Sequence, residues 1–412
     1  MIDLSLLRDN PENIILLLKK KDPKYNAQRL YDLDLKVRSL LVEVEALRQK
    51  KNELAKEGRA GVTIELREKS KRLSKELKEM EAELEHTRKE FKELYLCCPN
   101  ILQPDVPEGG KEKNKVVKEF GEKPQFDFDI KDHVELGNKL GWFDFGLSAK
   151  MSGSNFVFYK GDAVKLLYAL SMFMLKNNIK NGFEVVLPPY LVNEKSLITA
   201  SNFPKFKDQV YSLHDDQLYL TPTAEVNLAN VYRDTILPSE KLPIRMTSWT
   251  SCFRREAGTY GAAERGLIRI HQFEKVELFT LSEPEKSPEE LDRMIASAEH
   301  ILQKLGLHYR VSLLAAQDCS FPSSKTYDIE VWMPARKEYY EVSSCSNCTD
   351  FQSRRGMIRY KKAGENKNRL VHTLNGSSLA LPRLMVAIME TYQQEDGSIA
   401  IPEFLKKEAL FS

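Results

Sequence analysis

Charged and aromatic side chains follow a regular spacing in residues 253–279, which read FRREAGTYGAAERGLIRIHQFEKVELF. Arg254 and Glu256 precede a loop rich in glycine and alanine. After the loop a second set recurs every four residues: Arg269, Phe273 and Glu277. Side chains alternate between the two faces of a strand, so Arg254 and Glu256 are expected to share a face, as is the second set on the next strand. Two neighbouring strands would then present arginines, carboxylates and an aromatic ring together.

This combination suits a nucleoside triphosphate with its metal ion. The planar guanidinium of arginine binds phosphate oxygens through paired hydrogen bonds. An aromatic ring such as Phe273 can stack on a purine, with another arginine closing the opposite face through a cation–π contact. Carboxylates hold Mg²⁺ or accept hydrogen bonds from amino groups. Salt-bridged strand pairs would produce the same Arg-x-Glu pattern, so taken alone the pattern also fits a purely structural role.

The usual nucleotide-binding fingerprints are absent from the sequence. It contains no Gly-x-x-x-x-Gly-Lys loop and no Gly-x-Gly-x-x-Gly motif, and the zinc motif His-Glu-x-x-His is absent as well. A nucleotide would therefore have to be bound by another route.

The clearest long-range pattern is a heptad repeat in residues 27–95, interrupted at Gly58–Gly61. Apolar residues three and four apart on both sides of the break predict two helices that fold back as an antiparallel coiled coil. Residues 48–78, around the predicted tip, hold eleven Lys or Arg against five Glu, a net charge of +6. Such a tip is either an ordinary solvated surface or the part of an arm that contacts the phosphate backbone of a nucleic acid.

Residues 97–127 are rich in Pro, Gly and Lys and predict a linker between domains. Beyond residue 130, helices and alternating strands do not form regular βαβ units, which favours an α+β fold with an antiparallel sheet. The predicted helices are Asp162–Lys176, Pro288–Leu305 and Pro382–Gln394, and the predicted strands are Val185–Val192, Tyr327–Trp332 and Tyr339–Val342.

Composition excludes several classes of protein. The chain has 412 residues, enough for two domains, and a formal net charge of +2, so a nucleic-acid site would be a local patch. Six cysteines in so long a chain do not form a disulfide framework. No apolar run approaches the length of a signal core or a membrane span, so we expect a cytoplasmic protein with no membrane contact.

The order and spacing of residues 253–279 resemble motif 2 of the class II aminoacyl-tRNA synthetases, most closely that of the seryl-tRNA synthetase family. Further segments agree in order along essentially the full chain. Gly182–Pro189 is similar to motif 1, Leu220–Val226 to the amino-acid-binding segment, Glu341–Cys348 to the metal and ATP segment, and Asn375–Arg383 to motif 3.

The resemblance implies an N-terminal tRNA-binding domain, residues 1–108, with a coiled-coil arm at about 27–95. It implies a catalytic domain, residues 109–412, built on a mixed, mainly antiparallel β-sheet flanked by helices. Within that domain the resemblance puts motif 1 at about 165–192, motif 2 at about 246–279 and motif 3 at about 373–394.

The resemblance also implies roles for individual residues. Arg254 would hold the α-phosphate, Glu256 would approach the adenine amino group and the tRNA end, and Phe273 and Arg383 would enclose adenine. The catalytic residues would be Arg254, Glu256 and Arg383. The serine-binding residues would be Thr223, Ala224, Glu225, Glu277 and Ser377. The ATP-binding residues would be Arg254, Arg255, Glu256, Ile270, Phe273, Glu341, Val342, Ser343, Ser344 and Arg383. Glu341 and Ser344 would ligate Mg²⁺.

The implied function is that of a serine–tRNA ligase. It would activate L-serine with ATP and transfer the seryl group to tRNA(Ser), with the selenocysteine tRNA as a second candidate acceptor. We expect a homodimer formed through motif 1, with tRNA held by the arm and bound across the dimer. The alternatives are a related class II ligase with another amino acid or acceptor, and a non-catalytic coiled-coil interaction protein.

Three positions leave questions. Motif 3 has Ser378 and Pro382 where the family more often has glycine, which bears on the placement of Arg383. Proline is accepted in the first turn of a helix because its missing N–H has no partner there. Alternation puts Arg255 on the face opposite Arg254 and leaves it without a role.

Overall fold

The computed structural model describes residues 1–59, 61, 63–257 and 266–407. The loop within the predicted motif 2, residues 258–265, lies outside the described residues. The chain forms two compact units that divide between Pro99 and Asn100. No helix in the described ranges is long and apolar enough to cross a membrane.

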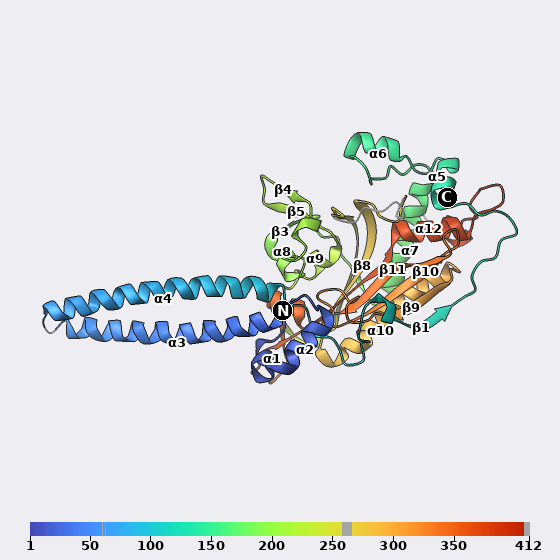
Figure 1. The fold of residues 1–412 in the computed structure, drawn as a ribbon. Helices are drawn as coiled ribbons and strands as arrows, with labels where there is room; N and C mark the ends of the chain where they lie inside the picture. Colours follow the sequence, from blue (N-terminus) through green and yellow to red (C-terminus); the bar gives the residue numbers. More distant parts are fainter. Residues whose placement is uncertain (60, 62, 258–265, 408–412) are drawn as a thin grey trace. The chain divides into compact units, whose positions relative to one another are not determined.

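The N-terminal unit consists of helices only. Two short helices lead into two long ones, and Figure 1 shows the long pair running antiparallel side by side. The helices are α1 (Leu4–Asp9), α2 (Pro11–Lys21), α3 (Ala27–Glu57) and α4 (Ile64–Leu96). The predicted coiled-coil hairpin is confirmed.

Apolar contacts and helix caps explain why α3 and α4 form a hairpin. The predicted heptad positions pack in one seam, with Leu40, Val44 and Leu47 against Leu77 and Leu84. Ion pairs also cross between the helices: Arg29–Glu90, Lys36–Glu83 and Arg48–Glu81. The side chains of Asn26 and Thr63 cap the starts of α3 and α4 by accepting backbone N–H bonds, which satisfies donors that a helix start leaves unpaired.

The second unit is built on an eight-stranded sheet with the order β1-β9-β10-β11-β14-β8-β7-β2. All neighbours are antiparallel except β2 and β7, so the sheet is mixed and mainly antiparallel, as predicted. The strands are β1 (Lys115–Phe120), β2 (Glu184–Val185), β7 (Ile244–Phe253), β8 (Gln272–Ser282), β9 (Tyr309–Leu313), β10 (Lys325–Met333), β11 (Glu338–Asn347) and β14 (His372–Ala380).

Three helices pack against this sheet and form the main core with it: α7 (Asp162–Lys180), α10 (Ser287–Lys304) and α12 (Leu381–Thr391). A second core lies around α8 (Glu194–Thr199) and α9 (Ala224–Leu228), and α11 (Phe351–Gly356) packs against α8. Two small sheets complete the unit, namely β3 (Leu191–Asn193) with β5 (Leu218–Leu220) and β4 (Ser212–Leu213), and β13 (Arg369–Leu370) with β12 (Arg359–Lys361) and β6 (Ile236–Pro238). The remaining helices are α5 (His133–Leu140), α6 (Phe145–Ser152) and α13 (Glu403–Lys406).

Two predictions about the elements were wrong in part. The predicted linker, residues 97–127, contains strand β1, which pairs with β9 at the edge of the large sheet. Residues from Asn100 onward also belong to the second unit, because the Asn100 amide donates to the carbonyls of Pro322 and Cys348. The predicted strand over 185–192 is divided between β2 and β3, since proline cannot donate to a strand ladder.

The expected alternation in motif 2 was also wrong in part. Strand β7 ends at Phe253, so Arg254 and Glu256 lie beyond it, and Glu256 has a left-handed backbone with φ of 47°. Strand β8 begins at Gln272, so Arg269 precedes it. Only Phe273 and Glu277 share a strand face as predicted. Arg254 is positioned instead by its backbone N–H, which donates to the carbonyl of His271 at 2.8 Å.

Candidate active site

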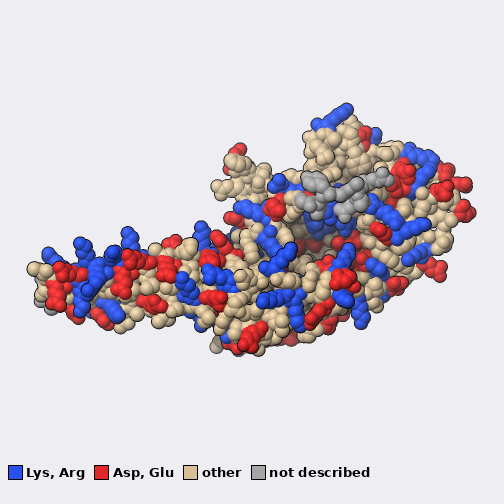
Figure 2. All heavy atoms as spheres, viewed as in Figure 1, with Lys and Arg blue, Asp and Glu red and all other residues tan. Residues whose placement is uncertain are grey.

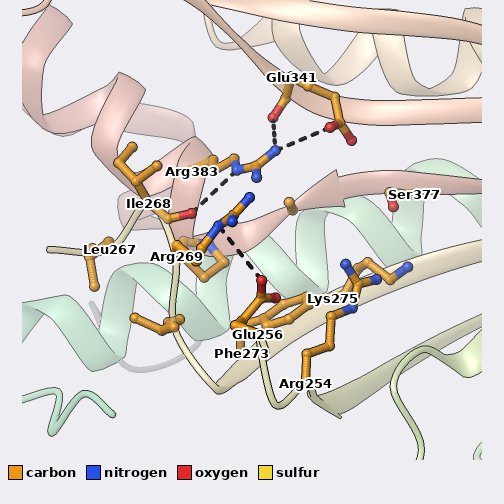
Figure 3. Close-up of a pocket in the computed structure, with 13 residues that line it drawn as sticks. Arg254, Glu256, Leu267, Ile268, Arg269, Phe273, Lys275, Glu341, Ser377 and Arg383 are labelled. Carbon is orange, nitrogen blue, oxygen red and sulfur yellow. Dashed lines mark hydrogen bonds and ion pairs between the residues drawn. The ribbon is translucent and has the colours of Figure 1, made fainter. Parts of the chain in front are cut away.

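Residues of motif 2, motif 3 and the predicted metal and ATP segment meet at a cavity of about 260 Å³ in the second unit. Figure 3 shows Phe273 and Glu256 on one side of it, Arg383 and Glu341 on the other, and Arg254 and Lys275 toward Ser377. The lining comes from the segment after β7, from the start of α12, from β8, β11 and β14, and from residues 267–270. It comprises Arg254, Glu256, Leu267, Ile268, Arg269, Ile270, Phe273, Lys275, Glu341, Ser377, Ala380, Pro382 and Arg383.

Arg254 is anchored at the point where β7 ends. Its Nε donates to the carbonyl oxygen of Pro222 at 3.2 Å, and its guanidinium carbon lies 5.2 Å from the centre of the Phe273 ring. The guanidinium is thus held beside the ring by a cation–π contact while it faces the cavity. A phosphate bound here would meet a cation whose direction is already set.

Arg383 approaches from the start of α12. Its Nη1 donates to the backbone oxygen of Glu341 at 2.7 Å and to the Oε2 of Glu341 at 3.3 Å. Pro382 lies in the first turn of the helix, where a missing N–H is harmless, so it does not disturb Arg383. A second ion pair on the cavity wall joins Arg269 and Glu256 at 3.6 Å. The cavity is therefore lined by three arginines and two carboxylates.

A buried polar network borders the cavity at β8. The hydroxyl Oγ1 of Thr223 donates to Oε2 of Glu277 at 2.8 Å and accepts from Nζ of Lys275 at 2.8 Å. Lys275 also forms an ion pair with Glu277. Glu277 is 1% exposed, so its carboxylate is held by a cation and a hydroxyl rather than by water. A small polar ligand would meet a carboxyl group, an amino group and a hydroxyl here.

Glu225 lies in the first turn of α9, two residues after the cap Thr223. Its Oε1 accepts from Nε2 of Gln352 at 2.7 Å and from Nδ2 of Asn375 at 3.0 Å. Burial, together with the nearby charge of Glu277, raises the pKa of Glu225 to about 7. This carboxylate has amide partners and a neighbouring negative charge, so a positively charged ligand group would stabilise it.

A β-bulge in β14 determines which motif 3 residues face the cavity. Ser377 pairs with Glu277, but the next pair joins Leu379 to Val276, so Ser378 is the extra residue. The bulge lets Ser377 and Ala380, three positions apart, both line the cavity. The side chain of Ser378 is buried, and its hydroxyl donates to Oδ1 of Asn178 at 3.3 Å. The serine at this position thus has a structural partner on α7.

A second β-bulge brings the predicted metal ligands together. Ser343 pairs with Ile329 and Glu341 with Glu330, so Val342 is the extra residue in β11. Glu341 and Ser344 consequently line the same cavity of about 480 Å³, together with Asp328. Oδ1 of Asp328 is buried and has no hydrogen-bond partner in the described part of the chain. Burial and the charge of Glu341 raise the pKa of Asp328 well above its ordinary value.

These oxygen donors fit Mg²⁺ as an incomplete protein site. In the described ranges, no three His, Cys, Asp or Glu side chains converge closely enough to hold a metal ion by themselves. Mg²⁺ commonly takes one or two carboxylates and completes its shell with waters and substrate phosphates. The orphaned oxygen of Asp328 beside Glu341 and Ser344 matches that pattern.

The other predicted site residues occupy varied positions. Ala224 and Val342 are fully buried. The hydroxyl of Ser343 donates to the backbone oxygen of Ser377. Ile270 lines the first cavity. Arg255 is exposed and is not part of the cavity lining, and its backbone N–H donates to the carbonyl of Gln209 at 2.9 Å.

Lys275 and Gln352 contact this site and are not among the residues predicted from the sequence. Lys275 stands between Phe273 and Glu277 and so shares their face of β8, a signal that the alternation rule offered. Gln352 lies on α11, more than a hundred residues from Glu225 along the chain, and no pattern in the sequence joins them.

Comparison with known proteins first defines the class. Residues 206–392 match the family model "tRNA synthetase class II core domain (G, H, P, S and T)", and residues 1–102 match "Seryl-tRNA synthetase N-terminal domain". With the antiparallel sheet and the arginine-lined cavity, these matches make the chain a class II aminoacyl-tRNA synthetase.

Full-length relatives define the family within that class. The chain is 47% identical to the serine–tRNA ligase of Hydrogenobaculum sp. and 44% identical to serine–tRNA ligase 2 of Clostridium acetobutylicum, and at least 98% of each chain is covered. The seryl-tRNA synthetase of Pyrococcus horikoshii, solved with ATP, superposes with a TM-score of 0.90 at 36% identity over 99% of this chain and 98% of that one. The chain belongs to the seryl-tRNA synthetase family, whose members are ATP-dependent serine–tRNA ligases.

Proposed function

We propose that the cavity between β8 and α12 binds ATP and that the network at Thr223 and Glu277 binds serine beside it. The main support for this proposal is that the cavity and the buried network are continuous. Lys275 lines the cavity and also donates to Thr223 in the buried network. A serine carboxylate next to Lys275 would therefore lie close to a phosphate next to Arg254.

ATP would be held by charge and by stacking. Arg254 would bind the α-phosphate, Phe273 would stack on adenine, and Arg383 would cover the opposite face of the base. Glu256 would accept from the adenine amino group. The backbones around Ile270 and Val342–Ser343 complete the proposed contacts. Arg255 stays a prediction as an ATP ligand, because its exposed side chain is not part of the cavity lining.

Serine would lie among Thr223, Glu225, Glu277 and Ser377. We assign its ammonium to Glu225 because this carboxylate lacks a close cationic partner among the described contacts, whereas Glu277 already pairs with Lys275. The hydroxyl of serine would then reach Glu277 and Ser377, which face each other across β8 and β14. A site built to hydrogen-bond a hydroxyl rejects an analogue that lacks it by roughly 10⁴–10⁵-fold, so alanine should be excluded.

The chemistry needs no protein nucleophile. A serine carboxylate oxygen attacks the α-phosphorus, the bond to pyrophosphate breaks, and seryl-adenylate forms. A hydroxyl of the terminal tRNA ribose then attacks the seryl carbonyl and AMP leaves. Arg254 and Arg383 would neutralise developing phosphate charge, and Lys275 would orient the attacking carboxylate. Mg²⁺, held by Glu341 and Ser344 with Asp328 nearby, would add further neutralisation when bound.

A homodimer formed through motif 1 is part of the proposal. β2 is the edge strand of the large sheet, and apolar side chains are exposed beside it, with Leu187 78% exposed. Others in this region and on α7 are also exposed: Tyr168, Met172, Ile179, Val185, Tyr190 and Leu191. An exposed apolar surface next to an unpaired strand edge supports association with a second copy.

The coiled-coil arm is proposed to bind tRNA. Figure 2 shows Lys and Arg side chains over the distal part of the hairpin, and the sequence of residues 48–78 carries a net charge of +6. Basic side chains on such an arm would displace counterions from the tRNA backbone. The division into a tRNA-binding domain, 1–108, and a catalytic domain, 109–412, stays part of this proposal, as does a cytoplasmic location.

The deciding assay is ATP–pyrophosphate exchange with each common amino acid. Serine should support exchange, while alanine should not exceed background. Threonine should give weak exchange at most, because only its extra methyl group distinguishes it from serine. Exchange with another amino acid, and none with serine, would show that the serine assignment is wrong.

A further inference from the structure

Gln352 on α11 is fully buried and lies outside the predicted motifs. Its side chain contacts Glu225, one of the proposed serine-binding residues. Its amide nitrogen Nε2 donates to Oε1 of Glu225 at 2.7 Å and to the carbonyl oxygen of Ala200 at 3.2 Å. Its amide oxygen Oε1 accepts from the hydroxyl of Thr373 at 2.7 Å. One side chain therefore joins α9, the end of α8 and β14.

The surroundings of Gln352 determine which way its amide points. A carbonyl oxygen can only accept, so the group that faces Ala200 must be the NH₂ end. That end also faces Glu225, while the oxygen faces the Thr373 hydroxyl, which is free to donate. The opposite orientation would set oxygen against oxygen at two contacts. Gln352 is thus fixed as a donor to Glu225.

Glu225 needs such a donor because its other surroundings are mixed. The charges that act on it are the negative charge of Glu277 and the positive charge of Lys275, both on β8, and the positive charge of Arg254 beyond the end of β7. Burial and Glu277 raise the pKa of Glu225 to about 7, and the bond from Gln352 opposes that rise more strongly than either cation. Without Gln352, a larger share of Glu225 would be protonated at neutral pH.

We propose that Gln352 is a positioning residue for serine, which keeps Glu225 ionised and oriented to receive the ammonium group of the substrate. Gln352 and Asn375 both donate to Oε1 of Glu225 and thereby set the rotation of the carboxylate, so that Oε2 is the oxygen offered to serine. Gln352 itself touches no substrate in this scheme. The inference rests on the proposed role of Glu225 in serine binding.

The test uses the full-length chain with Gln352→Met, which keeps the length of the side chain but removes the amide. Pyrophosphate exchange is measured between pH 6.5 and 8.5, with KM determined separately for serine and ATP. We expect the KM for serine to rise about ten-fold or more at pH 7, because a hydrogen bond to a charged group is lost. The defect should shrink toward pH 8.5, where Glu225 ionises without help. The KM for ATP and kcat should change little.

A structural role alone would give a different result. A serine KM that is unchanged at pH 7, or raised by the same factor at every pH, would overturn the inference. Should Gln352→Met fail to fold, Thr373→Val serves instead, since it removes the donor to the amide oxygen and leaves only the Ala200 carbonyl to orient the amide beside Glu225. It should give a smaller rise in serine KM with the same pH trend, and an unchanged KM would again overturn the inference.

Glu225→Gln separates this inference from the proposed function. This variant should weaken serine binding at every pH. If it leaves the KM for serine unchanged, the proposed role of Glu225 is wrong. If it raises the KM while Gln352→Met does not, Glu225 binds serine and only the positioning role of Gln352 is wrong.

Discussion

Lys275 and Thr223 come from different parts of the second unit, yet the lysine Nζ donates to the threonine Oγ1 at 2.8 Å. The same lysine pairs with Glu277, which accepts from the Thr223 hydroxyl at 2.8 Å. A closed triangle of cation, hydroxyl and carboxylate thus lies between strand β8 and the cap of α9. Because Lys275 also lines the arginine-rich cavity, this triangle couples the proposed serine site to the proposed ATP site.

Replacing Lys275 should impair the activation of serine far more than replacing a surface lysine does. Lys275→Met leaves the buried Glu277 without its cation, and removing one partner of a buried pair typically costs about 3–5 kcal/mol. We expect a loss of at least about 100-fold in kcat/KM for serine, together with a lower unfolding temperature. Lys286→Met is the matched control, because the Lys286 side chain is 51% exposed and its partner Glu283 does not line the cavity. Equal effects in the two variants would contradict the coupling role.

Glu225 should make stability depend on pH. Its pKa is raised from 4.5 to about 7 in the folded chain, so folding favours its protonated form. The stabilisation is fully present below pH 4.5 and is lost as pH rises through about 7. Replacement by Gln removes this ionisation cost. Glu225→Gln should therefore gain stability relative to the parent between pH 5 and pH 8, measured by urea unfolding. A difference that does not vary with pH would contradict the raised pKa.

The coiled-coil arm should be needed for transfer of the seryl group to tRNA and not for activation of serine. Deleting residues 30–94 removes most of α3 and α4, while the cavity lies wholly in the second unit. Serine-dependent pyrophosphate exchange should stay largely intact, and charging of tRNA should be abolished. Wild-type charging should also weaken steeply with added salt, because phosphate contacts release counterions. Equal loss of both activities would mean that the arm is a structural element.

The exposed apolar surface near β2 should hold two copies together. Leu187 is 78% exposed, and a charge there would be buried unpaired in any interface that covers it. Leu187→Asp should shift the protein from dimer to monomer in light scattering after size exclusion. Leu16→Asp, at an exposed leucine of α2 in the N-terminal unit, is the control and should leave the assembly unchanged. A wild-type monomer would disprove the motif 1 dimer.

Replacing Ser378 of motif 3 by glycine should lower the free energy of unfolding. Ser378→Gly removes the hydrogen bond to Asn178 and adds backbone freedom to the unfolded chain. We expect a loss of about 1 kcal/mol, measured by urea unfolding. In an Asn178→Ala background, which lacks the acceptor, Ser378→Gly should cost less in a double-mutant cycle, because only the backbone contribution remains. Additive losses would show that the bond contributes nothing.

Much of the fold and many of the site residues could be predicted from local sequence patterns. Heptad spacing predicts the hairpin because side chains three and four apart meet on one helix face, and the packed seam at Leu40, Val44 and Leu84 follows that spacing. The motifs in residues 253–279 and around Arg383 identify the residue types that a triphosphate needs. The family resemblance supplied their roles and the order of the domains.

Only the tertiary structure determined which of these residues reach the same cavity and which contacts hold them there. Simple alternation cannot bring Glu341 and Ser344 to one cavity, and a bulge at Val342 does so because the opposing strand β10 sets the register. Arg254 is positioned by a hydrogen bond to His271, since β7 has already ended. The contact between Gln352 and Glu225 joins positions far apart in the chain. Register and long-range hydrogen bonds depend on partners that are distant in sequence, whereas helix and strand periodicities depend only on near neighbours.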